Sequence, residues 1–453
     1  MGGGEVDTQP TAALLTPYLP RLVVDWLATG PEATYQEVDG TIAFVDISGF
    51  TKLSERLARQ GKVGAEELAG TISSCFTSLL AVAYAEGGGL LKFGGDALLL
   101  LFSGPSHALR AARAALAMRR TLAVVGRLDV LGQRIQLRMS VGVHSGVFHF
   151  FLVGRSHREL IITGPAASAT VRMEGTAEAG EVLVSDQTAA ALPKRLLGAR
   201  KGDGTLLRRV RTDEVLDLTL PVHVPVGLDL SLAVPVALRR QMLEGSLQPE
   251  HRRVTVAFVH FDGTDAVIER HGPQDAATRL GALVERAQEA AEQHGVTFLA
   301  SDVDHDGGKI ILVAGAPTAS GDDEQRMLLA LRHLITGDVG VSVRIGVNRG
   351  DVFVGDVGPA YRRTYTVMGD TVNLAARVMA KAAPGQLLAT QGVLDRSRTR
   401  FDTEALEPFM VKGKSKPVHA FVVGGVAGGR SYGEEQLPLI GRETELAALL
   451  TAL

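Results

Sequence analysis

Residues 365–377 read YTVMGDTVNLAAR, and the organisation of the chain can be worked out from this stretch. A strand-like run meets a Gly-Asp turn and passes into an alanine-rich helix. Asn373 and Arg377 are four residues apart, so their side chains share one helical face. An amide and a fixed cation that point the same way suit a sugar and a phosphate. A solvated helix face is the simpler interpretation, so other parts of the chain have to decide.

An earlier segment supplies the paired carboxylates that this stretch lacks. Residues 41–46 read TIAFVD, a buried strand that ends in Asp46, and a turn that opens a helix follows. Asp96 follows a Gly94-Gly95 turn and begins an apolar strand, where a charge without a partner is costly. Asp46 lies beside the backbone amides of a helix start, and an acid in that position suits a metal and phosphate site. A turn or capping role is the alternative for Asp96.

Composition excludes several classes of protein. The 453 residues are 45% hydrophobic and 21% charged, and the net charge of −3 gives no footprint for nucleic acid or an anionic membrane. The single cysteine, Cys75, excludes an internal disulfide and is expected to be buried in a helix. Apolar runs such as 97–102 are too short to cross a bilayer, and no secretory signal is evident. We therefore expect a cytoplasmic protein with no nucleic-acid partner and no membrane span.

The chain repeats one plan, which is its main organisational signal. Five segments of the second half each resemble an earlier segment. Residues 255–261 resemble 41–47, 274–294 resemble 64–86, 307–313 resemble the hairpin at 94–95, 343–348 resemble 139–144, and 366–377 resemble 161–172. The order of helices and strands in each copy predicts an antiparallel sheet with helices on one face, an α+β domain of ferredoxin-like type.

The repeat predicts the division of the chain. An amphipathic helix is expected over 11–30. The expected parts are a lead-in and helix at 1–35, a first domain at 36–220, a linker at 221–250, a second domain at 251–425, and a linker with the start of a further module at 426–453.

The two copies differ where the chemistry would lie. The position of Asp46 is taken by His260 in the second copy, and the region of Asp96 holds Gly308 and Lys309. The carboxylates therefore belong to the first copy alone.

The helix residues show the opposite asymmetry. Asn373 corresponds to Ser168 in the first copy, whereas Arg377 keeps its counterpart as Arg172. Each copy therefore carries half of a constellation. If the copies pack head-to-tail, one shared groove is complete and its twin is damaged.

In these residues the sequence resembles the class III nucleotidyl cyclases, specifically the tandem, bicarbonate-responsive soluble adenylyl cyclases. Residues 44–51 (FVDISGFT) resemble the first metal motif and 92–96 (KFGGD) the second. Residues 365–377 resemble the transition-state helix and 411–414 (VKGK) the closing phosphate-contacting strand. The resemblance covers about 40–425, and several ordered motifs in a duplicated frame are more specific than one alone. It implies two ferredoxin-like class III cyclase domains that form an intramolecular head-to-tail pseudo-dimer.

The resemblance also implies an activity, conversion of ATP to cyclic AMP and pyrophosphate with two Mg²⁺ or Mn²⁺ ions. Asp46, Ile47 and Asp96 are then the metal ligands, and Asn373 and Arg377 the catalytic residues. The implied substrate contacts are Phe50, Thr51, Lys309, Thr366 and Lys414. Thr366 stands in the adenine-reading slot, where the soluble branch of the family has threonine.

Two departures from the family pattern concern the base and the phosphates. Lys309 is the only lysine near the second hairpin, yet counting back from residues 315–317 puts Asp306 nearer the base-reading slot. Counting from the glycine turn instead aligns Lys309 with Asp96. The residue two positions before the GVHSG strand, which is usually basic, is Ser140, with Arg138 two residues further back.

The damaged groove would contain Lys92 and Arg172, at places where the soluble cyclases bind bicarbonate. Two convergent cations without a metal suit a small anion. The alternative is that Lys92 pairs with a nearby carboxylate and Arg172 is a surface helix residue.

The end of the chain resembles a different family. Residues 437–446 (LPLIGRETEL) resemble the entry segment of a P-loop ATPase module, and we expect this chain to be a fragment of a longer one that contains it. Alternatives to an adenylyl cyclase are a nucleotide- or anion-sensing regulatory module for that ATPase and a guanylyl cyclase, which Thr366 opposes. The glycine turn before Asp96 also suggests a diguanylate cyclase, but the tandem copies and the Asn373/Arg377 helix argue against it.

Overall fold

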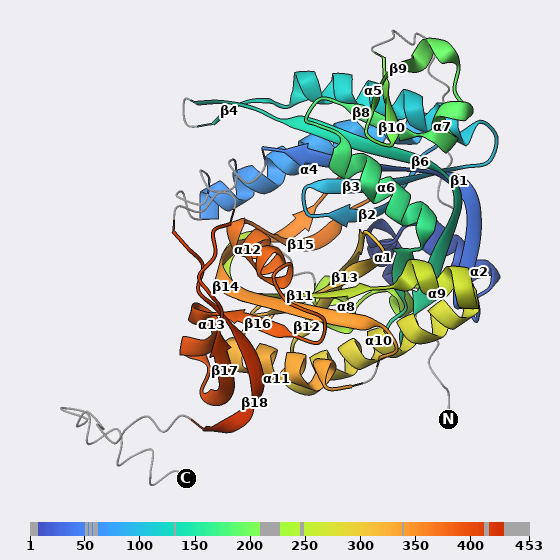
Figure 1. Cartoon of the computed structure of the whole chain (residues 1–453). Coiled ribbons are helices and arrows are strands. Elements are labelled where there is room, and N and C mark those ends of the chain that lie inside the picture. Colours follow the sequence, from blue (N-terminus) through green and yellow to red (C-terminus); the bar gives the residue numbers. More distant parts are fainter. Residues whose placement is uncertain are drawn as a thin grey trace.

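The computed structural model describes residues 8–49, 53, 57, 62–130, 133–208, 227–244, 249–337, 339–411 and 416–429. These residues form two similar domains, each built on an eight-stranded sheet. Figure 1 shows the first domain, in blue to green, stacked above the second, in yellow to red. A small ribbon of β4 (Arg127–Val130) and β5 (Gln133–Gln136) extends from the first domain.

The first sheet has the strand order β2-β3-β1-β6-β8-β10-β9, with β7 paired to β6. Its strands are β1 (Tyr35–Ser48), β2 (Gly89–Gly94), β3 (Ala97–Ser103), β6 (Arg138–Val153), β7 (Glu159–Thr163), β8 (Val182–Ser185), β9 (Leu197–Lys201) and β10 (Gly204–Leu207). The sequence also predicts a strand over 135–144 and a strand or hairpin near 147–162; the structure has one long strand, β6, which forms a hairpin with β7.

The second sheet repeats this order as β12-β13-β11-β14-β16-β18-β17, with β15 paired to β14. Its strands are β11 (Glu250–Asp262), β12 (Thr297–Asp304), β13 (Gly307–Ala314), β14 (Ser342–Val357), β15 (Thr364–Met368), β16 (Leu387–Thr390), β17 (Thr399–Ala405) and β18 (Ala420–Gly429). The identical order confirms the repeat.

Both sheets are mixed, so the expectation of a purely antiparallel sheet was wrong. β6 pairs with β8 in parallel, and β14 pairs with β16 in parallel. A parallel neighbour requires a crossover connection. Helix α6 (Pro165–Thr176) lies in the first crossover, and helix α12 (Asp370–Met379) in the second.

Helices cover both faces of the sheet, which also corrects the expectation of one. Helices α4 (Lys62–Ala85) and α5 (His107–Val125) pack on the face that presents Val141 and Val143. Side chains alternate along a strand, so Gly142 faces the other side, where a Cβ atom would collide with the backbone of Glu174 in α6. Gly346 meets the backbone of Met379 in α12 in the same way.

The remaining helices complete the two domains. They are α7 (Asp186–Ala190) in the first domain and α9 (Thr264–His271), α10 (Pro273–His294), α11 (Asp323–Ile335) and α13 (Gln391–Arg396) in the second. Helix α8 (Val236–Glu244) precedes the second sheet. Single turns of 3-10 helix occur at Lys194–Leu196 and Leu230–Ala233.

The two domains exchange side chains reciprocally. Phe353 and Val357 from β14 and Met368 from β15 join the hydrophobic core under α4 of the first domain. Phe151 and Val153 from β6, with Ile161 from β7, join the core under α10 of the second domain. Each domain therefore places the same strands against the same helix of the other, which confirms the head-to-tail pseudo-dimer.

The N-terminal segment is broken by prolines. The helix expected over 11–30 is instead α1 (Thr8–Leu15), a 3-10 turn (Thr16–Tyr18) and α2 (Arg21–Thr29). Proline has no N–H for a helical hydrogen bond, so Pro17 and Pro20 interrupt the helix. Trp26 of α2 is 1% exposed and anchors the segment in the central core.

One helix is long and apolar enough to be compared with a membrane span. It is the segment 66–85 of α4. Its side chains Ile72, Cys75 and Phe76 are buried in the first-domain core, so packing within the protein explains its apolar character. The predicted burial of Cys75 is confirmed.

Candidate functional site

Asp46 and Asp96 lie together at the end of the central strands. Asp46 is the third residue from the end of β1, opposite Ala97 on β3 and Ser140 on β6. The Ile47 N–H donates to the Asp96 carbonyl at 3.2 Å, which holds the β2–β3 turn against β1. Burial, followed by the charge of Asp46, raises the pKa of Asp96 to about 7. Burial also raises the pKa of Asp46.

Glu174 at the end of α6 adds a third carboxylate. Burial, and then the charge of Asp46, raise the pKa of Glu174 to about 7. The Ser140 hydroxyl donates to Glu174 Oε1 at 3.0 Å. Ser140, at the position expected to be a basic phosphate contact, therefore holds an acid in place.

The second domain contributes a fourth carboxylate, Asp302 on β12. Its Oδ2 lies 3.0 Å from the point where a side chain at Gly94 would begin. Its charge contributes, after burial and Asp46, to the raised pKa of Asp96. We call Asp46, Asp96, Glu174 and Asp302 the acidic site; it is built from both domains.

The carboxylates of Asp46 and Asp96 suit divalent cations. Neighbouring carboxylates in a partly buried site disfavour each other's charged forms, and a cation relieves this cost. Among the residues that the structure describes, no group of three or more His, Cys, Asp or Glu side chains forms a metal cage. Magnesium in nucleotide sites needs only one or two carboxylates, because phosphates and water complete its coordination. Asp46 and Asp96, with the intervening backbone of Ile47, fit that arrangement.

The helix that carries Asn373 and Arg377 is fixed to β14 at its start. The Asn348 amide donates to the Thr371 carbonyl at 3.0 Å, and the Thr371 hydroxyl donates to the Asp351 carbonyl at 2.9 Å. Ala375 and Val378 are fully buried beneath the helix. Asn373 and Arg377 are half-buried on one face of α12, as their spacing predicted.

The two expected base contacts lie on β15 and β13. Thr366 is half-buried opposite Gly355 of β14. Lys309 lies opposite His260 of β11, and its ammonium is 2.9 Å from Asp304 Oδ2. The base-reading roles of both residues stay predictions.

The strand register identifies the counterparts of the metal ligands. Phe44 faces Gly142 in the first sheet as Phe258 faces Gly346 in the second, so His260 takes the place of Asp46, as predicted. Lys309 then matches Ala97, and Gly308 takes the place of Asp96. The alternative alignment of Lys309 with Asp96 is therefore wrong by one residue, because the second hairpin is longer.

The second-domain residues that correspond to the metal ligands contact other residues of the protein, and we call this group the twin site. His260, 3% exposed, lies with its Nε2 3.4 Å from Asp304 Oδ2. Burial would raise the pKa of Asp304, but His260 and Lys309 together hold it below its usual range. Across the domain boundary, Ser168 Oγ accepts a hydrogen bond from the Asp306 N–H at 2.8 Å. The twin site comprises His260, Asp304, Asp306, Lys309 and Ser168.

Lys92 is fully engaged by protein groups. Its ammonium donates to Glu159 Oε1 at 2.9 Å, to Ser301 Oγ at 2.7 Å and to the Ser301 carbonyl at 2.9 Å. An ammonium has three N–H donors, so this set is complete. Burial opposes the charge of Glu159, but Lys92, His157 and Ser301 hold its pKa below the usual range. Arg172 is exposed on α6. Both observations are what the alternative interpretation expects, and the anion site of Lys92 and Arg172 stays a prediction.

Some expected residues lie outside the described part of the chain. They are Phe50, Thr51, Lys414 and the ATPase-like segment 437–446. Their proposed roles stay predictions.

Sequence reasoning missed four residues that shape the two sites. They are Asp302, Glu174, Glu159 and Ser301. Glu174 carries a weak signal, since it follows Arg172 by two residues on the predicted helix. Asp302, Glu159 and Ser301 act across the fold: Ser301 is 209 residues from Lys92.

Comparison with known proteins agrees with this geometry. A family model described as "Adenylate and Guanylate cyclase catalytic domain" matches residues 32–207 and again 247–424, which is most of the chain.

Two mammalian relatives align over most of the chain. "Adenylate cyclase type 10" of Oryctolagus cuniculus is 23% identical over 95% of this chain, and that of Homo sapiens is 24% identical over 80%. The alignments cover only 30% and 25% of those proteins. This chain therefore spans less than a third of the curated relatives it matches.

A solved structure shares the two-domain fold. It is a class III adenylyl cyclase-like ATP-binding protein from Pseudomonas aeruginosa, with a TM-score of 0.58 and 14% identity, and the match covers 80% of this chain and 85% of that one. At this identity the likeness concerns the fold alone.

Proposed function

The chain belongs to the adenylate and guanylate cyclase family, with two catalytic domains in tandem, and we propose that it is an adenylyl cyclase that converts ATP to cyclic AMP and pyrophosphate. The observation that carries the proposal is the pair Asp46 and Asp96, which the Ile47–Asp96 hydrogen bond holds together. Asp302 of the other domain reaches the same hairpin. A nucleotide there would contact both domains.

In this proposal Asp46 and Asp96, with the Ile47 backbone, hold two Mg²⁺ or Mn²⁺ ions. When bound, these ions would lower the pKa of the ribose 3′-hydroxyl and neutralise charge on the triphosphate. Glu174, which Ser140 holds beside Asp46, adds negative charge that would strengthen cation binding.

Arg377 and Asn373 act on the rest of the nucleotide. The ribose 3′-hydroxyl loses its proton to solvent water, and its oxygen forms a bond to the α-phosphorus as the bond to the pyrophosphate oxygen breaks. Little covalent work falls to the protein, so positioning and charge stabilisation dominate. Arg377 would neutralise charge on the α-phosphoryl group, and Asn373 would hold the ribose. Phe50, Thr51 and Lys414 are proposed as further substrate contacts.

Thr366 is the proposed reader of adenine. Its hydroxyl can accept a hydrogen bond from the adenine amino group. We keep Lys309 as its proposed partner, for which it would have to exchange its contact with Asp304 for the base. The name of the mammalian relatives supports adenine.

The second candidate is a guanylyl cyclase. "Guanylyl cyclase, membrane" of Dictyostelium discoideum is 27% identical over 45% of this chain.

The third candidate is a regulatory module that binds a nucleotide or an anion without efficient turnover. Ser140 favours it, because its hydroxyl holds Glu174 where a basic phosphate contact was expected. In that role the domains would control the ATPase module proposed to follow residue 437.

Bicarbonate stimulation is a further proposal, and it has a structural condition. Lys92 is paired with Glu159, so bicarbonate would have to replace that carboxylate. If it does, bicarbonate raises turnover in the wild type, and the effect disappears in Lys92→Ala. Equal responses of the two proteins would exclude this site.

The proposed location is the cytoplasm, whose reducing conditions suit a lone buried thiol.

One assay separates the three candidates. The protein is incubated with Mn²⁺ and either ATP or GTP, and both cyclic nucleotides are measured. The proposal predicts cyclic AMP from ATP, with Asp46→Ala as the inactive control. Cyclic GMP as the main product would favour the second candidate. Binding of ATP without either product would favour the third.

A further inference from the structure

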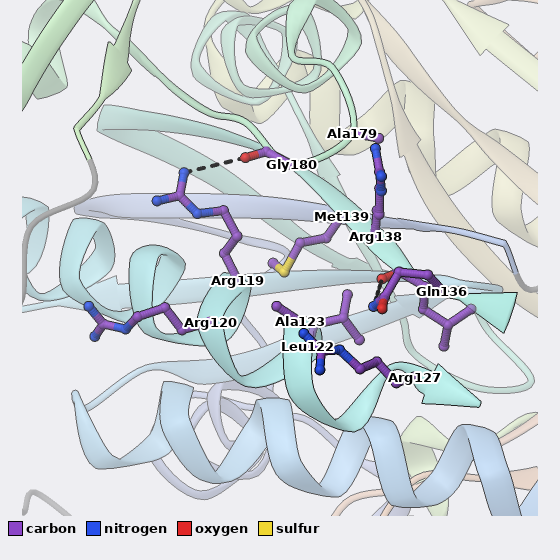
Figure 2. A pocket seen from close by; sticks show the side chains of 11 residues that line it. Arg119, Arg120, Leu122, Ala123, Arg127, Gln136, Arg138, Met139, Ala179 and Gly180 are labelled. Atoms are coloured by element: carbon purple, nitrogen blue, oxygen red, sulfur yellow. Dashed lines mark hydrogen bonds between the residues drawn. The ribbon is translucent and has the colours of Figure 1, made fainter. Parts of the chain in front are cut away.

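An arginine-lined pocket lies at one end of the first-domain sheet. It shares no residue with the acidic site or the twin site, although two of its residues, Arg138 and Met139, pair with β1 next to Asp46. Its volume is about 580 Å³. Figure 2 shows Arg119 from α5, Arg127 from β4 and Arg138 from β6 on different sides of it, with Arg120 at its edge. Pockets of this size accommodate small-molecule ligands.

The charge of the pocket is one-sided. None of the described residues that line it is acidic. Arg127 and Arg138 are exposed and form no ion pair within the described part of the chain. The guanidinium groups of Arg127 and Arg138 around one space repel each other and create a positive potential, which an anion would neutralise.

The other walls indicate what kind of anion fits. The side chains of Leu122, Ala123 and Met139 give the pocket an apolar side. Arg119 donates to the Gly180 carbonyl at 3.4 Å, which orients its side chain across the pocket (Figure 2). A guanidinium group can donate two parallel hydrogen bonds to two oxygens of one phosphate, and arginine is a preferred partner of phosphate groups. Several arginines with an apolar wall therefore suit a phosphorylated small molecule better than a simple halide.

We propose that this pocket binds a small molecule with at least two phosphate groups, without a divalent cation. It is a second ligand site, and the proposal does not depend on the cyclase reaction. Arg138 is two residues before Ser140, whose hydroxyl holds Glu174 of the acidic site. An occupant of the pocket would thus contact the strand that positions that carboxylate.

Binding of pyrophosphate in excess EDTA tests the proposal by isothermal titration calorimetry. Chelation removes the cations that an anion would need at the acidic site, so the arginine pocket is measured alone. We expect one equivalent to bind the wild type and Asp46→Asn equally. The double variant Arg127→Gln/Arg138→Gln should bind at least tenfold more weakly. Arg134→Gln is the matched control, because Arg134 is exposed on β5 but does not line the pocket.

A second readout uses the wild type alone. Pyrophosphate should slow amide hydrogen exchange in the end of α5 and the start of β6 and leave the second domain unchanged. Absence of binding to the wild type, equal affinity of the double variant, or protection only around Asp46 and Asp96 would each overturn the proposal.

Discussion

The acidic site and the twin site occupy matching positions of a duplicated frame, and they treat charge in opposite ways. In the acidic site, carboxylates lie beside one another, and the pKa values of Asp96 and Glu174 are raised to about 7. In the twin site, Asp304 lies beside the Lys309 ammonium at 2.9 Å and the His260 imidazole at 3.4 Å. Asp302, which the acidic site takes from the second domain, has the cations of Lys309 and Lys92 nearby. Asp46, Asp96 and Glu174 lie close to one another and suit a cation from outside the chain, whereas Lys309 supplies a cation to Asp304.

Duplication has separated two tasks in this chain. Identical backbone registers hold aspartate at residue 46 and histidine at residue 260. One boundary between the domains can therefore keep mutually repelling groups for a ligand. The other contains the Lys309–Asp304 ion pair and the hydrogen bond between Asp306 and Ser168. Mutually repelling carboxylates reduce stability, so a site that retains them is a candidate for function.

Replacement of Asp46 and of its counterpart His260 by alanine should give the largest difference in cyclase activity. Asp46→Ala should lower cyclase activity by a factor on the order of a hundred to a thousand, because a metal ligand is lost. His260→Ala should leave most of the activity, because it removes a contact of the twin site. The rate of cyclic AMP formation with Mn²⁺ and ATP measures both. Similar losses in the two variants would contradict the asymmetry.

The two arginines of the equivalent helices form the next pair. Arg377→Ala should lower the rate about a hundredfold, because transition-state charge on the phosphoryl group is left unbalanced. Arg172→Ala should change the rate less than threefold, since this exposed side chain belongs to the helix beside the twin site. Steady-state kinetics of both variants decide. The comparison breaks if Arg172→Ala is the more damaging change.

The pH dependence of stability should have opposite signs at the two sites. The raised pKa values of Asp96 and Glu174 mean that their stabilising contribution is present below about pH 4 and is lost as the pH rises through about 7. The lowered pKa values of Glu159 and Asp304 mean that the stabilising contribution of these two carboxylates is present above about pH 4 and is lost on acidification.

Denaturant unfolding in EDTA from about pH 5 to about pH 8 measures the first of these effects. We expect Asp96→Asn to reduce the loss of stability on the alkaline side, and saturating Mn²⁺ to do the same in the wild type. If the unfolding free energy of Asp96→Asn has the same pH dependence as that of the wild type, the pKa of the Asp96 carboxyl is not raised by folding.

The ion pair of Lys92 should affect stability more than catalysis. The Lys92 and Glu159 side chains are 11% and 9% exposed. Lys92→Met leaves a buried carboxylate without its cation, so the free energy of unfolding should fall by about 3–5 kcal/mol. The double variant Lys92→Met/Glu159→Gln should recover part of that loss. Denaturant unfolding of the single and double variants is the test, and additive losses would argue against a direct pair.

Much of the architecture was predictable from periodicity and repetition. The duplicated plan and His260 at the position of Asp46 follow from segments that recur in the same order. The head-to-tail packing was expected from the complementary residues of the two copies and from the family resemblance. The mixed sheet was missed, because β8 and β16 are only four residues long and too short to show a hydrophobic period. The break in the N-terminal helix was signalled by Pro17 and Pro20, whose effect outweighs the apolar pattern.

The sites were less predictable than the fold. Asp46 and Asp96 end or begin apolar strands, so their unusual placement is visible in the sequence. Asp302 and Glu159 act on residues far away along the chain, and only the packed domains bring them together. The length of the second hairpin decides which residue replaces Asp96, and that length follows from strand pairing.

The most direct test of the asymmetry between the two sites is the stoichiometry of nucleotide binding. Equilibrium titration of the intact chain with a non-hydrolysable ATP analogue and Mn²⁺ should give one bound nucleotide per chain. The same titration of Asp46→Asn should show no metal-dependent binding, and that of His260→Asn should still show one. Two nucleotides per chain, or one that persists in Asp46→Asn and disappears in His260→Asn, would contradict the account.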